Sequence, residues 1–378
     1  MRKLLIIIFL ILSYLLFWSN FTATGVIIDT RFFVIILSII LVSIFIYFLL
    51  KERKPYYYIV LSLSLLLLIL SIKEYYFLYD EKEITFQNDG KDFYGTLYKP
   101  KFTESKCLIV FIHGSGSETR KEYAFHARHL ARKGIASFTY DKRGSGKSGG
   151  ETYEVGYRGY ANDAIAAIKR VKSQNNFKQV GLFAVSEGEW VSLIVDSLEK
   201  IDFILMVSAS GTSPFQQTLR ELTYRLERKN FNNKDIKEAK SLYQKILAFD
   251  NDSLNRKQIE SKIMKSQNKA WFEAGEDFSN ELYYYPWWHK VMNFNPKEYL
   301  EKTNTDILVL IGDDNQSFPP SETISNFKRY KNIKVVKFDK GDHSLLQWKF
   351  GKGIPPPFFV KGYLKTYTKW IKNNCNKN

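Results

Sequence analysis

Ser186 is the residue of this chain whose type and surroundings best fit nucleophilic chemistry. It follows the apolar run 180–184, and two small residues, Ala184 and Gly188, lie two positions before and after it. A sharp strand-to-helix turn strains the backbone of its serine and brings the strand against the helix, so the flanking positions must be small. The spacing therefore predicts that Ser186 lies at the tip of such a turn, although an ordinary tight turn can show the same pattern.

Two backbone N–H groups are candidates for stabilising the oxyanion that attack on a carbonyl would create. The apolar run 107–112 predicts a buried strand, and the glycine-rich loop after it contains Ser115. Glu187 directly follows Ser186 in the other loop. N–H groups of Ser115 and Glu187 that point inward would form an oxyanion hole, whose donors act where charge develops in the transition state.

His343 is the candidate general base. It lies in a loop after the predicted strand 333–338, near the end of the chain. A turn with acidic residues follows another predicted strand, 307–311, and lies between Ser186 and His343. The order nucleophile, acid, histidine is one in which catalytic triads occur, and the carboxyl ends of parallel strands bring such residues to one edge of a sheet.

Taken together, these motifs resemble the α/β-hydrolase superfamily, near its dienelactone-hydrolase-like and prolyl-oligopeptidase-like esterase branches. The resemblance extends from about Ile84 to the C-terminus and includes residues 140–148, which are similar to the structural Asp-x-Arg-Gly-x-Gly-x-Ser loop after the fourth strand. It implies an α/β fold in which helices cover both faces of a mostly parallel sheet. Glu189 and Trp190 stand where the family often has a second glycine, and we expect them near the mouth of the site.

The resemblance also implies a function. It implies a serine hydrolase that cleaves a small-molecule acyl ester, or a lipid-like substrate, by way of an acyl-enzyme. A peptidase or thioesterase with the same triad is the alternative among enzymes, and a non-catalytic binding protein that keeps the fold is the alternative of another class. We expect His113 to support its own loop, and the other histidines form no metal-ligand pattern, so neither a metal nor a cofactor is expected.

The third member of the triad is ambiguous. Spacing from Gly312 and from Pro319 places Asn315 where the family usually has an aspartate. In a serine-protease triad, asparagine in place of the aspartate lowers turnover about 10⁴-fold, because the histidine takes the wrong tautomer. We therefore favour Asp314 as the acid, which requires the turn to be shifted by one residue, with Asp313 as a weaker candidate.

A long insertion interrupts the alternation of strands and helices. Residues 211–303 are rich in Lys and Glu and are expected to be mainly helical. In this superfamily an insertion at that point resembles a lid over the active site. The aromatic residues Tyr285, Trp287 and Trp288 near its end are candidates for lining an acyl pocket, or else they fill the core of the lid.

The N-terminal region, 1–75, differs in composition from the hydrolase-like part, 76–378. It contains three uncharged segments, near 4–22, 32–50 and 55–72, and each has about the length that a helix needs to cross a membrane. Basic residues precede the first segment and separate the second from the third. Because basic ends stay on the cytoplasmic side, three spans would place the hydrolase domain on the extracytoplasmic side of a multi-pass membrane protein.

Charge and cysteine content add to this picture. The formal net charge of +16 favours anionic lipid surfaces, whereas no motif supports nucleic-acid binding. The chain has two cysteines, Cys107 inside a predicted strand and Cys375 in the tail. From their positions in the sequence we expect no disulfide framework.

Overall fold

The computed structural model describes most of the chain after the N-terminal region. The described residues are 78–249, 253–275, 278, 286–348 and 357–377, with separate positions between 39 and 69. The expected span 4–22 lies outside the described residues, and the spans 32–50 and 55–72 are described only in part. Within the part of the chain that is described, no helix is long and apolar enough to cross a membrane.

An eight-stranded sheet forms the centre of the molecule, in the order β1-β2-β4-β3-β5-β6-β7-β8. Strand β2 is antiparallel to both of its neighbours, and the strands from β4 to β8 pair in parallel. This is the mostly parallel sheet that the sequence predicted. The strands are β1 (Tyr79–Asn88), β2 (Lys91–Pro100), β3 (Cys107–Ile112), β4 (Ala136–Tyr140), β5 (Gln179–Val185), β6 (Phe203–Val207), β7 (Asp306–Gly312) and β8 (Ile333–Phe338).

Strands β1 and β2 form a hairpin with a two-residue turn. Asn88 pairs with Lys91, and the turn residues Asp89 and Gly90 have φ values of 53° and 67°. Positive φ at both central positions is the signature of a turn whose twist matches that of paired strands, and Asp-Gly is a preferred sequence for it. The hairpin covers the edge of the parallel sheet.

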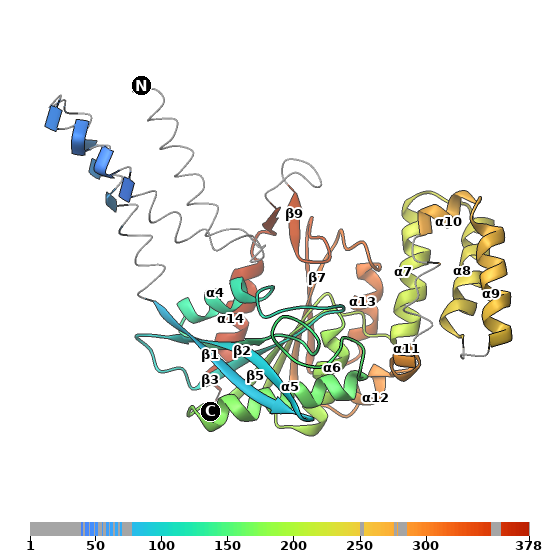
Figure 1. Ribbon diagram of the computed structural model, residues 1–378, viewed down its shortest axis with the longest axis horizontal. Helices are drawn as coiled ribbons and strands as arrows, with labels where there is room; N and C mark the ends of the chain where they lie inside the picture. The colour runs from blue at the N-terminus through green and yellow to red at the C-terminus, as the bar shows by residue number, and fades with distance from the viewer. Residues whose placement is uncertain are drawn as a thin grey trace.

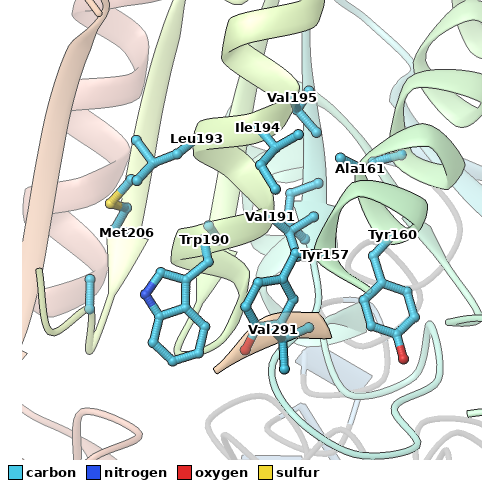
Figure 2. Packing of buried hydrophobic residues seen from close by; sticks show 14 of the residues in the cluster. Tyr157, Tyr160, Ala161, Trp190, Val191, Leu193, Ile194, Val195, Met206 and Val291 are labelled. Atoms are coloured by element: carbon cyan, nitrogen blue, oxygen red, sulfur yellow. The ribbon is translucent and has the colours of Figure 1, made fainter. Parts of the chain in front are cut away.

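Helices cover both faces of the sheet (Figure 1). Helices α5 (Tyr157–Ser173) and α6 (Gly188–Leu198) pack on one face, and α4 (Ala124–Arg132) and α14 (Tyr363–Cys375) pack on the other. Side chains alternate along the central strand β3, so that Val110 belongs to the first core cluster and Phe111 to the second. Figure 2 shows the packing of the first face, with Val191 of α6 between the two helices.

The helical insertion lies between β6 and β7. Its helices are α7 (Pro214–Arg228), α8 (Asn233–Leu247), α9 (Ser253–Ser266), α10 (Ala270–Gly275), α11 (Pro286–Val291) and α12 (Pro296–Leu300). Helices α7 to α10 form a lobe to one side of the sheet (Figure 1). The side chains of Ser213 and Asn232 accept hydrogen bonds from the first turns of α7 and α8, which explains where these helices begin.

The last part of the chain completes the sheet's far edge and the histidine loop. Helix α13 (Pro320–Phe327) connects β7 to β8. After β8 come the short paired strands β9 (Leu346–Trp348) and β10 (Pro357–Phe359), and α14 ends the described chain.

A disulfide joins Cys107 to Cys375, so the expectation that the two cysteines stay unpaired was wrong. They lie 268 positions apart in sequence, but α14 packs along the sheet and brings its end to the start of β3, where the two Cα atoms are 5.6 Å apart. The tertiary packing, not the sequence spacing, creates this pair. Closing so long a loop restricts the unfolded chain and stabilises the fold by on the order of 3–5 kcal/mol.

Candidate active site

Ser186 lies at the sharp turn between β5 and α6, where the spacing predicted it. Its φ is 51°, a left-handed conformation that a residue other than glycine rarely adopts. Its backbone N–H donates to the carbonyl of Val207 at the end of β6, over 2.9 Å. A Cβ on Gly188 would lie 2.7 Å from the carbonyl oxygen of Ile112, so only glycine allows α6 to begin this close to β3. The strain and the close packing are those of a nucleophile turn.

The two predicted oxyanion donors are available. Within the described residues, the backbone N–H groups of Ser115 and Glu187 donate no hydrogen bond. By contrast, the neighbouring N–H of Gly114 is occupied by the carboxylate of Glu118, at 2.7 Å, and by the hydroxyl of Tyr123. The close approach of Gly188 to the carbonyls of Ile112 and His113 brings the start of α6 against the end of β3, from which the loop of Ser115 follows.

A buried ion pair ties these two loops to each other. The Lys142 ammonium donates to the carboxylate of Glu187 and to the carbonyl of Gly114, each over 2.7 Å. The side chains of Lys142 and Glu187 are only 4% and 6% exposed. This role of Lys142 could not be predicted from the sequence, because the residues of its loop give no sign of which side chain points toward the serine turn.

Asn315, and not Asp314, lies beside the histidine. Its side-chain oxygen is 3.2 Å from Nδ1 of His343, and Asn315 is fully buried. The Asp314 carboxylate instead points outward to Arg228 of α7, at 2.8 Å, and is about half exposed. The Asp313 carboxylate accepts the backbone N–H of Lys340. Our preference for Asp314 is therefore corrected in favour of the alternative Asn315.

The backbone of the turn explains this correction. The N–H of Asp313 donates to Phe338 and the N–H of Asp314 donates to Gly341, both over 2.9 Å, which continues the pairing of β7 with the chain after β8. A shift by one residue would break both bonds. With this register the two aspartates stand on the outside of the turn, and the next residue, Asn315, points into the protein.

The orientation of the Asn315 amide follows from a second contact. The backbone N–H of Ser317 donates to the same side-chain oxygen at 2.9 Å. An N–H group can only donate, so the atom that faces it must be the oxygen and not the NH₂. Nδ1 of His343 must then carry the proton that this oxygen accepts. The opposite nitrogen, Nε2, is left with a free lone pair, which is the tautomer that a general base needs.

This arrangement leaves one polar group unsatisfied. The side-chain nitrogen of Asn315 is buried and has no hydrogen-bond partner in the described part of the chain. A buried donor without a partner costs about 1–3 kcal/mol. The turn therefore holds the amide oxygen against His343 at the expense of stability.

The imidazole is neutral over most of the pH range. Desolvation lowers the pKa of His343 to about 4, and the nearby Asp342 carboxylate opposes this shift only in part. The uncharged Asn315 amide offers no anion to stabilise an imidazolium. His343 is therefore ready to accept a proton, but its protonated form is poorly stabilised.

The ends of adjacent strands connect the serine to the histidine loop. Ser208, next to the Val207 that binds the Ser186 backbone, has a φ of 55°, and its hydroxyl donates a short hydrogen bond to the carbonyl of His343. The structure describes both residues of the pair, and no hydrogen bond joins the Ser186 hydroxyl to the His343 ring. Such catalytic contacts are often long without substrate and shorten when it binds.

We expected Glu189 and Trp190 near the mouth of the site, but the structure does not place them there. The Glu189 carboxylate is buried and accepts the backbone N–H groups of Ser210 and Gly211 at 2.7 and 2.9 Å. Burial raises the pKa of Glu189 to about 7, against the effect of these hydrogen bonds. Trp190 stacks on Tyr157 of α5 (Figure 2), and its indole N–H donates to the carbonyl of Thr212. Glu189 and Trp190 of α6 therefore both anchor the start of the helical insertion.

The candidate aromatic residues of the insertion are partly accounted for. Trp287 and Trp288 are buried, and their indole N–H groups donate to the backbone carbonyls of Val155 and Leu247. Both rings therefore serve the core of the insertion and its contact with the sheet domain. Tyr285 lies outside the described residues.

The remaining motif residues have structural roles, as the sequence indicated. The buried guanidinium of Arg143 pairs with Asp163, at 2.6 Å, and Asp141 accepts backbone N–H groups of its own loop region. Nε2 of His113 contacts the carbonyl of Tyr140 at 2.6 Å, and burial lowers the pKa of His113 to about 3. In the described part of the chain, no group of three or more His, Cys, Asp or Glu side chains could hold a metal ion.

Comparison with solved structures decides the fold. Est1E from Butyrivibrio proteoclasticus, solved with ferulic acid, is 16% identical with a TM-score of 0.50, and the match covers 77% of this chain and 96% of that one. DcsB, solved with a substrate analogue, is 15% identical with a TM-score of 0.52, covering 79% and 100%. The chain has the α/β-hydrolase fold.

Further comparisons agree with this fold. An esterase from Pyrococcus furiosus is 14% identical with a TM-score of 0.50, and the match covers 78% of this chain and 91% of the esterase. The protein-family model described as serine aminopeptidase, S33, matches residues 103–278. A search of curated proteins gave no match.

Proposed function

We propose that this protein is a serine hydrolase that cleaves carboxylic esters through an acyl-enzyme on Ser186. The observation that carries the proposal is the strained Ser186 at the end of β5, next to two free backbone N–H groups. The neutral His343 on the adjacent loop supplies a base. The esterases among proteins of the same fold, and the serine-peptidase family model, support a hydrolase of this kind.

The reaction would proceed in two halves. Ser186 Oγ attacks the acyl carbonyl while Nε2 of His343 takes the hydroxyl proton. The backbone N–H groups of Ser115 and Glu187 bind the oxyanion of the tetrahedral intermediate, and an interaction of this kind is worth about 3–4 kcal/mol per donor. The imidazolium then gives its proton to the departing alkoxide. In the second half, His343 takes a proton from water, the hydroxide attacks the acyl-enzyme, and Ser186 is released with its proton restored.

Asn315 takes the third place of this proposed triad. Its oxygen accepts the Nδ1 proton of His343 and is itself held by Ser317. The amide therefore orients the ring and selects the productive tautomer, as a carboxylate would. It differs from a carboxylate in one respect, because it brings no negative charge to stabilise the imidazolium that forms during the reaction.

The hydrolysis of short-chain aryl esters by the full-length protein in detergent tests this proposal. Ser186→Ala should abolish turnover, and His343→Ala should be nearly as damaging, because nucleophile and base act as a unit. Ser173→Ala, which changes an exposed serine on α5, is the matched control and should leave turnover unchanged. Full activity of Ser186→Ala would show that hydrolysis, if present, uses another group.

A peptidase is the second candidate, because the matching family model carries a serine-aminopeptidase description. Ester and amide substrates use the same triad, so the geometry does not separate them. Aminoacyl anilides and aryl esters of matched acyl groups should be compared by kcat/KM. A higher value for the anilides would replace the esterase proposal with the peptidase one.

We also propose that the N-terminal segments anchor the protein in a membrane and leave the hydrolase domain on the extracytoplasmic side. The uncharged segments and their basic flanks support this topology. The disulfide between Cys107 and Cys375 supports it independently, because disulfides persist in oxidising compartments. A reporter active only outside the cytoplasm should be active when fused after Asn378 and inactive near Arg53. The reverse pattern would contradict the topology.

A further inference from the structure

A cleft lined by lysines lies in the helical lobe, between α8 and α9. It has a volume of about 740 Å³. Its α8 wall contains residues spaced three or four apart, which share one face of the helix. The α9 wall repeats this pattern and continues just beyond the end of the helix. The six lysines that define this lysine cleft are Lys234, Lys237, Lys245, Lys262, Lys265 and Lys269.

Among the described residues, the lining of the lysine cleft contains a single carboxylate. Glu238 forms a short ion pair with Lys269, so its charge is already used. Asp235 on α8 and Glu260 on α9 are not part of the lining, and Glu260 pairs with Arg256. Five of the six lysines therefore have no carboxylate partner within the lining.

Two of these lysines face each other across the cleft. Lys245 on α8 and Lys262 on α9 both line the cleft, and the nearby Lys245 ammonium lowers the pKa of Lys262. Like charges repel each other, and the two helices gain nothing from bringing them together. An anion between the ammonium groups would turn this repulsion into two attractive contacts.

The start of α8 adds to the positive potential. Lys234 lies in the first turn of α8, where the helix dipole already disfavours a cation. The only acidic residue of that turn, Asp235, binds the N-cap Asn232. Both the backbone and the side chains at this end of the cleft therefore favour a negative ligand.

We propose that the lysine cleft binds an anion that carries phosphate groups, as a free polyphosphate or as the headgroup of an anionic phospholipid. Lysine ammonium groups are compact charges with three donors each, and they suit the many oxygens of phosphate. Five uncompensated lysines call for more than one negative charge. Among the described residues, the lining offers no aromatic ring on which a nucleic-acid base could stack, so a single-stranded nucleic acid is disfavoured. The site is separate from Ser186 and does not depend on the proposed hydrolase activity.

Thermal melts of the full-length protein in neutral detergent test this site. Pyrophosphate is the free probe, and phosphatidylglycerol in mixed micelles is the lipid probe, with phosphatidylcholine as its uncharged counterpart. A ligand that binds the folded state raises the melting temperature in proportion to its occupancy. We expect pyrophosphate, phosphatidylglycerol or both to raise it, and phosphatidylcholine not to. A response to pyrophosphate alone identifies a free phosphate ligand, and a stronger response to phosphatidylglycerol identifies the headgroup.

Two matched variants locate the binding. Lys245→Gln/Lys262→Gln removes the facing pair, and Lys334→Gln/Lys337→Gln removes the same charge from exposed positions on β8. The first should weaken binding of the responding probe by at least about tenfold, because it removes two ammonium groups that donate to the anion. The second should change it less than about twofold.

Loss of the Lys245–Lys262 repulsion should leave the double variant folded and at least as stable without ligand. Its far-UV circular dichroism and a single cooperative thermal melt report that fold. Equal weakening in the two double variants would reduce the effect to overall charge and overturn the proposal. So would the absence of any shift with either anionic probe.

Discussion

Replacing Asn315 with aspartate turns its side-chain amide into a carboxylate. This is the position at which the proposed triad differs from the usual Ser-His-Asp triad. The amide oxygen lies 3.2 Å from Nδ1 of His343 and already accepts from Ser317. A carboxylate in the same place would keep both hydrogen bonds. It would also remove the buried NH₂ group that lacks a partner among the described residues. Asn315→Asp should therefore fold, with an anion added beside the imidazole.

The size of the effect can be worked out from this distance. At 3.2 Å and an effective dielectric constant of about 20, the attraction between the carboxylate and an imidazolium is about 5 kcal/mol. Desolvation of the buried carboxylate offsets part of this attraction, and neighbouring opposite charges shift a pKa by about 1–3 units. The pKa of His343, lowered by burial to about 4, should rise by that amount. The same stabilisation of the forming imidazolium should raise turnover by about 10- to 1000-fold.

The assay is the pH profile of kcat/KM for one aryl ester from pH 4 to 9. His343 acts as a base only when it is neutral, so activity is lost as the pH falls through its pKa. The wild type should stay active to about its pKa of 4, and the acid limb of Asn315→Asp should lie about 1–3 units higher with a faster plateau. Asp314→Asn is the control and should change turnover less than about twofold, because an exposed ion pair contributes little. An unmoved acid limb with unchanged turnover in the folded variant would refute the placement of Asn315.

Three further predictions concern the scaffold. Lys142→Met should lower the free energy of unfolding by about 3–5 kcal/mol, because it leaves the Glu187 carboxylate buried without its partner. The double variant Lys142→Met/Glu187→Leu should recover part of this loss. Urea denaturation measures both changes. Cys375→Ser should lower the free energy of unfolding by about 2–5 kcal/mol, and a reductant should have no further effect on this variant. A wild type whose stability does not change with a reductant would exclude the disulfide. Stability should fall as the pH falls from about 6.5 to 4, by about 1 kcal/mol per pH unit for each neutral buried histidine. The reason is that burial lowers the pKa of these histidines in the folded state. They are His113, His126, His129 and His343. Glu189 acts in the opposite direction, since its pKa is raised to about 7, so a profile without a net loss below pH 6 would contradict the histidine burial.

Local patterns predicted the parts of the site that depend on one segment each. The apolar run before Ser186 and the small residues around it are enough to indicate the turn, because its strain and close packing are local requirements. The same holds for the Asp89-Gly90 hairpin, whose residues suit positive φ. The assignment of Ser115 as an oxyanion donor rests on the same local reasoning and stays a prediction.

Features that depend on contacts between two distant segments could not be predicted from the sequence. The choice between Asp314 and Asn315 is made by backbone bonds to the chain after β8, and nothing in the turn itself reveals their register. Glu189 looked like a group at the mouth of the site, yet its partners, Ser210 and Gly211, come from the end of another strand. The disulfide of Cys375 likewise depends on how α14 lies along the sheet.

Covalent labelling tests whether Ser186 is an activated nucleophile. The full-length protein should be treated with a fluorophosphonate and its peptides mapped by mass spectrometry. One adduct is expected, on Ser186, that forms quickly in the wild type, slowly in His343→Ala and not at all in Ser186→Ala. An unlabelled wild type, or an adduct that forms equally fast without His343, would contradict this expectation and leave a protein that keeps the fold without the chemistry.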